Sequence, residues 1–91
     1  MTVLGVSYLF RGRTHVGIQY LRVTDGGTTY IMTRMDVIHR IEAGTNVYTV
    51  GKDGSRAEVA VMEPDQQHPM QYLQTVADNT TADNLMSLPR F

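Results

Sequence analysis

Residues 20–36 read YLRVTDGGTTYIMTRMD, and this stretch decides the fold because it predicts a tight hairpin that runs directly into a capped helix. β-Forming residues lie on both sides of Asp25-Gly26-Gly27. Two-residue hairpin turns require positive φ, which these three residues tolerate. The stretch therefore predicts antiparallel strands over 15–24 and 28–32.

The helix signal begins at Thr33. Its hydroxyl can cap the free N–H groups of a first turn, and Asp36 can complete a capping box. Gly44 suits the left-handed conformation that ends helices. We expect one helix over 34–43 that docks an apolar stripe on the sheet. The stripe consists of Met35, Val37, Ile38 and Ile41.

Four further strands are predicted outside this stretch, over 3–10, 46–51, 56–62 and 70–76. In the first of them Leu4, Val6 and Tyr8 alternate onto one face. The prolines and polar residues of 63–69 indicate a surface loop. The sequence therefore predicts a β-rich α+β fold in a single domain over 1–91. It would have about six mostly antiparallel strands in hairpins, one central helix and a short helical or irregular tail.

Composition limits the classes of partner. The chain has 91 residues, 8 basic and 9 acidic side chains and no cysteine. The basic residues are scattered, which argues against binding to double-stranded nucleic acid. No apolar run approaches the ~18 residues of a membrane span, so no membrane association is expected. A core this small favours self-association. We expect a homo-oligomer in the cytoplasm of a bacterial host cell.

The sequence contains no recognisable catalytic constellation. No serine lies in a nucleophile elbow, and no glycine-rich phosphate loop is present. The three histidines, His15, His39 and His68, have no metal-ligand spacing. We expect a protein that is not an enzyme and that has no cofactor and no metal.

The C-terminal segment allows two interpretations. Six of the seven residues over 78–84 are polar, and Leu85 and Leu88 follow. The polar residues could form a turn while both leucines fill the core. Alternatively, Asp83 and Asn84 could form the lip of a pocket, with the leucines clamping a neighbouring chain.

The second half of the chain resembles a family of small bacterial and phage domains of unknown function. The likeness rests on Tyr72-Leu73-Gln74-Thr75 and on the Asn-Leu-x-x-Leu-Pro motif over 84–89, and it spans roughly 30–91. The family usually carries lysine or arginine at the position of Gln74, so a contact to an anionic ligand would differ here. In size and strand–helix–strand order the chain is also similar to phage anti-Thoeris proteins, which sequester nucleotide signals of bacterial immunity.

These patterns and resemblances predict a non-enzymatic binding protein. The expected ligand is a small anionic nucleotide-derived immune signal, such as a cyclic nucleotide or a relative of cyclic ADP-ribose. The alternative is a protein–protein interaction module, in which the helix or an edge strand binds a partner. The expected ligand-binding residues are Asn84, Asp83, Arg90, Gln74, Tyr72, Arg11 and Arg13.

Overall fold

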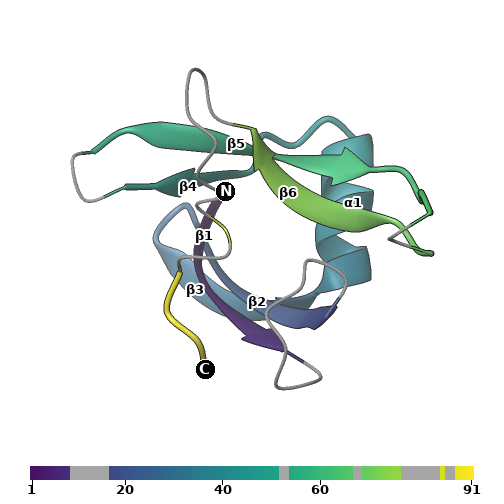
Figure 1. The fold of residues 1–91 in the computed structure, drawn as a ribbon. Coiled ribbons are helices and arrows are strands. Elements are labelled where there is room, and N and C mark those ends of the chain that lie inside the picture. The colour runs from purple at the N-terminus through teal and green to yellow at the C-terminus, as the bar shows by residue number, and fades with distance from the viewer. Residues whose placement is uncertain (9–16, 52–53, 67–68, 77–84, 86–87) are drawn as a thin grey trace.

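The structure is a computed structural model that describes residues 1–8, 17–51, 54–66, 69–76, 85 and 88–91 (Figure 1). Within these residues six strands and one helix follow one another, as the sequence predicts. They are β1 (Thr2–Tyr8), β2 (Ile18–Asp25), β3 (Thr28–Thr33), α1 (Arg34–Glu42), β4 (Tyr48–Val50), β5 (Arg56–Met62) and β6 (Tyr72–Val76).

The strands form one mixed sheet in the order β3-β2-β1-β4-β5-β6. All neighbouring pairs are antiparallel except β1 and β4, which pair in parallel at Thr2 and Tyr48. We call β1–β3 the first wing of the sheet and β4–β6 the second wing. Helix α1 contacts strands of both wings and packs between them (Figure 1). The predicted α+β, β-rich fold is confirmed.

The hairpin and the helix cap form as their sequences predict. Gly26 and Gly27 have φ values of 57° and 85°, which fit the tight turn between β2 and β3. The Asp36 N–H donates to the Thr33 hydroxyl at 3.1 Å, and the Thr33 N–H donates to the Asp36 carboxylate at 3.2 Å. Gly44 follows the helix with φ 101°. Local chemistry therefore fixes this part of the fold.

Two expected apolar faces are wrong in one residue each. Leu4 is 41% exposed because a β-bulge interrupts the pairing of β1 with β2 between Val3 and Gly5. The extra residue shifts the alternation of side chains. Met35 is also 41% exposed, because it lies about 200° around the helix axis from Val37, which is buried.

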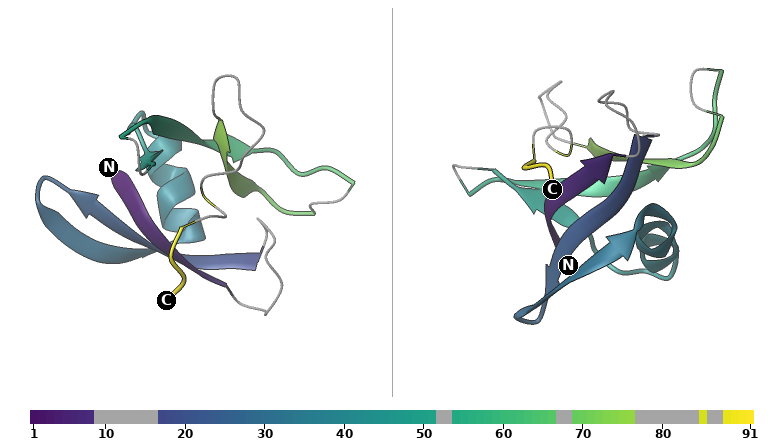
Figure 2. Two further views of the ribbon diagram at one scale, coloured as in Figure 1. Left: turned by 60° about the vertical axis from the view of Figure 1, so that its left-hand side comes forward. Right: turned by 90° about the horizontal axis from the view of Figure 1, so that it is seen from below.

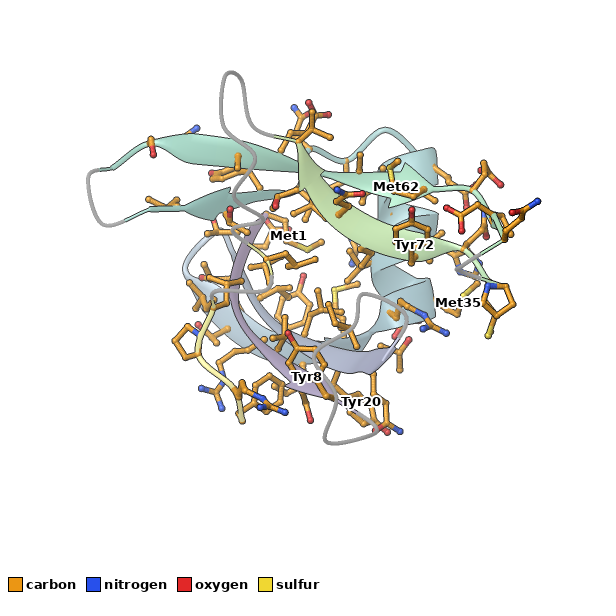
Figure 3. All side chains as sticks on the ribbon, viewed as in Figure 1. Met1, Tyr8, Tyr20, Met35, Met62 and Tyr72 are labelled. Carbon is orange, nitrogen blue, oxygen red and sulfur yellow. The ribbon has the colours of Figure 1, made fainter. Side chains whose placement is uncertain are left out.

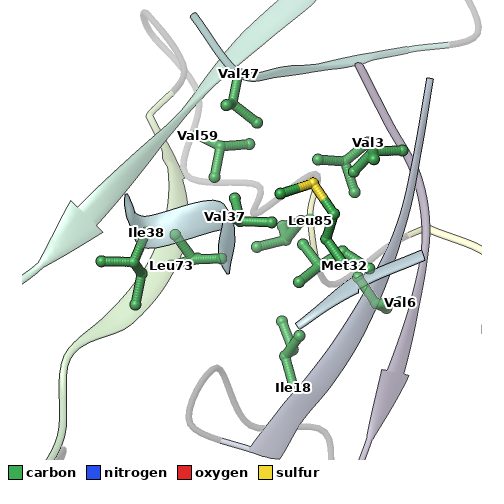
Figure 4. Close-up of a cluster of buried hydrophobic side chains, with 12 residues drawn as sticks. Val3, Val6, Ile18, Met32, Val37, Ile38, Val47, Val59, Leu73 and Leu85 are labelled. Atoms are coloured by element: carbon green, nitrogen blue, oxygen red, sulfur yellow. The ribbon is translucent and has the colours of Figure 1, made fainter. Parts of the chain in front are cut away.

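The core lies between the two wings and includes residues of α1, of every strand except β4, and Val47, which directly precedes β4 (Figure 4). Val37 and Ile38 are its contribution from the helix. Leu85 lies among these side chains and is fully buried. The core residues are Val3, Val6, Ile18, Leu21, Val23, Met32, Val37, Ile38, Val47, Val59, Leu73 and Leu85.

The C-terminal tail packs against its own chain. Leu85 is buried and Leu88 packs against the same core, so the interpretation that these leucines fill the core is confirmed. The interpretation that they clamp a neighbouring chain is wrong for Leu85, which has no exposed surface to offer. Beyond Leu88 the tail pairs with β1: the Val6 N–H donates to the Pro89 carbonyl at 3.0 Å, and the Phe91 N–H to the Val6 carbonyl at 3.1 Å.

Two buried threonines of the second wing give a matched test of this packing. Within the described residues the Thr49 hydroxyl has no hydrogen-bond partner, whereas the Thr75 hydroxyl accepts a bond of 3.3 Å from the Leu85 N–H. Leaving a buried polar group unpaired costs about 1–3 kcal/mol. We expect Thr49→Val to raise the free energy of unfolding by about 1 kcal/mol and Thr75→Val to lower it by about 1–3 kcal/mol. Urea denaturation measures both, and shifts of the same sign would contradict the assignment.

Candidate functional site

The tail approaches β1 closely at a glycine. A Cβ atom built on Gly5 would lie 2.9 Å from the Pro89 carbonyl oxygen and 3.4 Å from the Phe91 ring. Any larger residue at this position would therefore collide with the backbone of the tail. The absence of a side chain at Gly5 lets the tail lie against β1.

Two arginine–aromatic stacks form where the tail meets the first wing. The Arg90 guanidinium carbon lies 4.7 Å from the centre of the Tyr8 ring, and that of Arg22 lies 4.7 Å from the centre of the Phe91 ring. A cation at this distance over an aromatic face is attracted to the ring. We call the pair of Arg90 and Tyr8 the inner stack and the pair of Arg22 and Phe91 the outer stack.

The two stacks lie on opposite faces of the first wing. Tyr8 packs against the core, so the inner stack is at the end of the core between the wings. Arg22 pairs in register with Gly5 and Ile31, whose neighbours Val6 and Met32 point into the core, so the outer stack is on the outer face. The inner stack places a cation and an aromatic face beside the core, a combination that can bind a planar anionic ligand.

A third stack of the same type lies on the second wing. The Arg56 guanidinium carbon is 4.5 Å from the centre of the Tyr48 ring. These residues belong to β5 and β4, in the second wing. This stack therefore provides a matched control for experiments on the inner stack.

Of the expected ligand-binding residues, the structure describes Arg90, Tyr72 and Gln74. Arg90 belongs to the inner stack. Tyr72 and Gln74 lie on β6, and because Leu73 and Thr75 point into the core, both point to the outer face of the second wing. Figure 3 shows Tyr8 and Tyr72 on different wings. The structure therefore does not bring Arg90 together with the β6 pair. The other expected residues, Arg11, Arg13, Asp83 and Asn84, lie outside the described residues.

Tyr72 is 5% exposed and has a defined partner. Its hydroxyl donates to the Asp65 carboxylate at 3.4 Å. Burial raises the pKa of Tyr72 above its usual value of 10.0, and the negative charge and hydrogen bond of Asp65 add to this effect. The side chain is therefore held neutral, as a structural hydrogen-bond donor.

This environment predicts a pH dependence of stability. The pKa of Tyr72 is higher in the folded state than in the unfolded state, so its contribution to stability is complete below pH 10.0 and is lost as the pH rises through the folded-state pKa. We expect Tyr72→Phe to remove this part of the alkaline loss of stability. Asp65→Asn should lower the pKa of Tyr72, which a tyrosinate absorbance titration measures. An unchanged titration in Asp65→Asn would contradict the contact.

Tyr8, Arg22 and Phe91 were not predicted as members of these stacks. A signal was present in Gly5, because glycine inside a strand often marks the close approach of another backbone. The partner of that approach was not visible, since the tail is separated from β1 by almost the whole chain. Arg90 alone was predicted from its place in the tail.

Neither a metal site nor a membrane span emerges from the part of the chain that the structure describes. Its histidine, aspartate and glutamate side chains do not gather into any group of three or more that could hold a metal ion. Helix α1 has 9 residues, and no helix among the described residues has the length and hydropathy needed to cross a bilayer.

The fold and the stacks define a class: a small α+β domain with a curved six-stranded sheet, whose tail carries arginine–aromatic stacks at the first strand. Comparison with protein families then places the chain. The family described as "Protein of unknown function (DUF3892)" matches residues 11–89, and the chain belongs to it. The match confirms the predicted membership in a family of small domains of unknown function, and it begins earlier than the expected residue 30. No curated protein and no solved structure matches the chain.

Proposed function

We propose that this protein is a non-enzymatic binding protein that sequesters a small anionic nucleotide-derived signal at the inner stack. One observation supports this most directly: Arg90 lies over the Tyr8 ring, 4.7 Å from its centre, at the end of the core between the wings. A guanidinium binds phosphate oxygens through paired N–H groups, and an aromatic face stacks on a base. This one pair of residues thus provides a group that binds phosphate and a group that stacks on a base.

The proposed mechanism is stoichiometric capture. The Arg90 guanidinium would turn from the ring to the phosphate, and the base would take its place over Tyr8. Arg11 and Arg13 follow Tyr8 closely in the chain and would add positive charge. Asp83 and Asn84 would bind polar edges of the ligand. Gln74 faces away from this stack and would serve a separate contact, whereas Tyr72 keeps its structural hydrogen bond to Asp65.

The resemblance to phage anti-Thoeris proteins supports the class of ligand. It implies an immune signal such as a cyclic nucleotide or a cyclic ADP-ribose isomer, a bacterial cytoplasm and a homo-oligomer. The alternative is a protein-interaction module without a small-molecule ligand, which the open edge of β3 supports.

Calorimetric titration with cyclic nucleotides and cyclic ADP-ribose isomers tests the proposal. We expect the ligand to bind the wild-type protein saturably. Arg90→Ala should raise the dissociation constant by about tenfold or more, because a charged hydrogen bond contributes about 1.5–3 kcal/mol. Arg56→Ala removes a stack of the same geometry on the other wing and should leave the dissociation constant unchanged.

Three outcomes would contradict the proposal. The absence of heat with every ligand would remove nucleotide capture and favour the interaction module. Equal weakening by Arg56→Ala and Arg90→Ala would remove the inner stack as the site. Conversion of the ligand, detected by chromatography of the recovered nucleotide, would show an enzyme in place of a sequestering protein.

A further inference from the structure

Strand β3 forms an edge of the sheet and lacks the usual protection against pairing. Its six residues, TTYIMT, contain no charge and no proline. Its register with β2 is continuous from Asp25–Thr28 to Tyr20–Thr33, with no bulge. Natural proteins block open edges with charges, prolines or bulges. None of these devices is present on β3, and Figure 2 shows the β2–β3 hairpin at the outside of the molecule.

The hairpin determines which backbone groups of β3 face outward. In a two-residue hairpin the closing pair, here Asp25 and Thr28, exchanges hydrogen bonds, and every second pair after it does the same. Tyr30 and Met32 therefore bond to β2, whereas Thr29, Ile31 and Thr33 point their N–H and C=O groups away from it.

The helix cap provides an independent check of this assignment. The Thr33 N–H donates to the Asp36 carboxylate at 3.2 Å, so it is not bonded to β2. The Thr33 carbonyl, at the N-cap of α1, belongs to the first turn of the helix. Thr29 and Ile31 are the β3 residues that remain with outward backbone groups, and within the described residues these groups have no partner.

We propose that β3 pairs with β3 of a second copy of this chain, antiparallel and about a two-fold axis, with Thr29 opposite Ile31 of the other copy. An axis perpendicular to the sheet keeps each face on its own side, so opposed residues must come from the same face of β3. The Thr29 and Ile31 side chains both lie on the outer face of the sheet, and the backbone N–H and C=O groups of both residues point away from β2. With the axis centred on Tyr30, the outward N–H and C=O groups of Thr29 and Ile31 in the two copies form about four backbone hydrogen bonds.

The chemistry of the edge fits a second copy. No like charges meet in this register, because β3 is uncharged. The Ile31 side chain is 49% exposed, and it would pack on the methyl group of the opposing Thr29, a favourable cross-strand pair. The pairing would join two six-stranded sheets into one and cover the β3 edge of each.

The interface goes beyond the ligand proposal and does not rest on it. The inner stack lies on β1 and the tail, whereas this interface uses β3. Loss of ligand binding and loss of dimerisation are therefore separate results, measured on separate variants.

Sedimentation velocity over a range of protein concentrations, together with amide hydrogen exchange, tests the interface. We expect a dimer in which the Thr29 and Ile31 amides are protected at high concentration and exchange freely on dilution. The Tyr30 and Met32 amides, which bond to β2, should stay protected at both concentrations.

Variants on the two edges of the sheet complete the test. Ile31→Lys should raise the dimer dissociation constant by about tenfold or more, since a charge on the edge opposes pairing. Thr29→Lys should do the same if Ile31→Lys fails to fold. Val76→Lys is the matched control, because Val76 is 54% exposed on the other edge strand, β6. A monomer at every concentration, a dimer that survives both β3 variants, or dissociation caused by Val76→Lys would overturn the proposal.

Discussion

Leu85→Ala is expected to lower the free energy of unfolding by about 2–5 kcal/mol, the range for leucine truncation in a packed core. The side chain is fully buried among residues of both wings and of α1. Domains have only about 5–15 kcal/mol of stability in total, so this loss would bring the protein close to unfolding. Urea denaturation monitored by circular dichroism measures it.

Leu4→Ala is the matched control for this prediction. It removes the same atoms from a side chain that is 41% exposed at the bulge of β1. We expect a change within about 0.5 kcal/mol, as for most surface substitutions. Equal losses in both variants would contradict the placement of Leu85 in the core, and so would stability unchanged by Leu85→Ala.

The second large effect is expected from Gly5→Ala. The new methyl group would meet the Pro89 carbonyl at 2.9 Å, which is closer than real Cβ contacts. Either β1 or the tail must then shift, at a cost of about 1–3 kcal/mol for an overpacked site. We also expect faster hydrogen exchange at the Val6 and Phe91 amides, because these donate the two bonds that hold the tail to β1.

Gly26→Asn is a suitable control for the Gly5 substitution. Nothing lies within 4 Å of a Cβ built on Gly26, and its φ of 57° is one that asparagine tolerates. This variant should keep both the stability and the slow exchange of the tail amides. Tail amides that exchange equally slowly in Gly5→Ala and the wild type would show that the close approach does not depend on glycine.

The parts of the fold that depend on neighbouring residues could be predicted from the sequence. The turn at Gly26-Gly27 and the cap formed by Thr33 and Asp36 depend on interactions within four residues, and both formed as expected. The order of the strands could not be predicted. It depends on the parallel pairing of Thr2 with Tyr48, for which the local pattern contains no signal.

The candidate site shows the same division. Arg90 could be identified because charged residues near a chain end are available to ligands. Its contact with Tyr8 joins two strips of sequence almost a full chain length apart, so only the structure shows it. The burial of Leu85 is also non-local, and therefore the sequence alone left its two interpretations open.

The edge of β1 has a consequence for synthesis of the protein. That edge is shared: β4 pairs with it at Thr2, and the tail pairs with it at Val6. During synthesis β1 therefore stays incompletely paired along this edge until residues 85–91 have left the exit tunnel. Until then the nascent chain exposes part of its apolar interior, and its need for chaperones should be greatest before this segment has emerged.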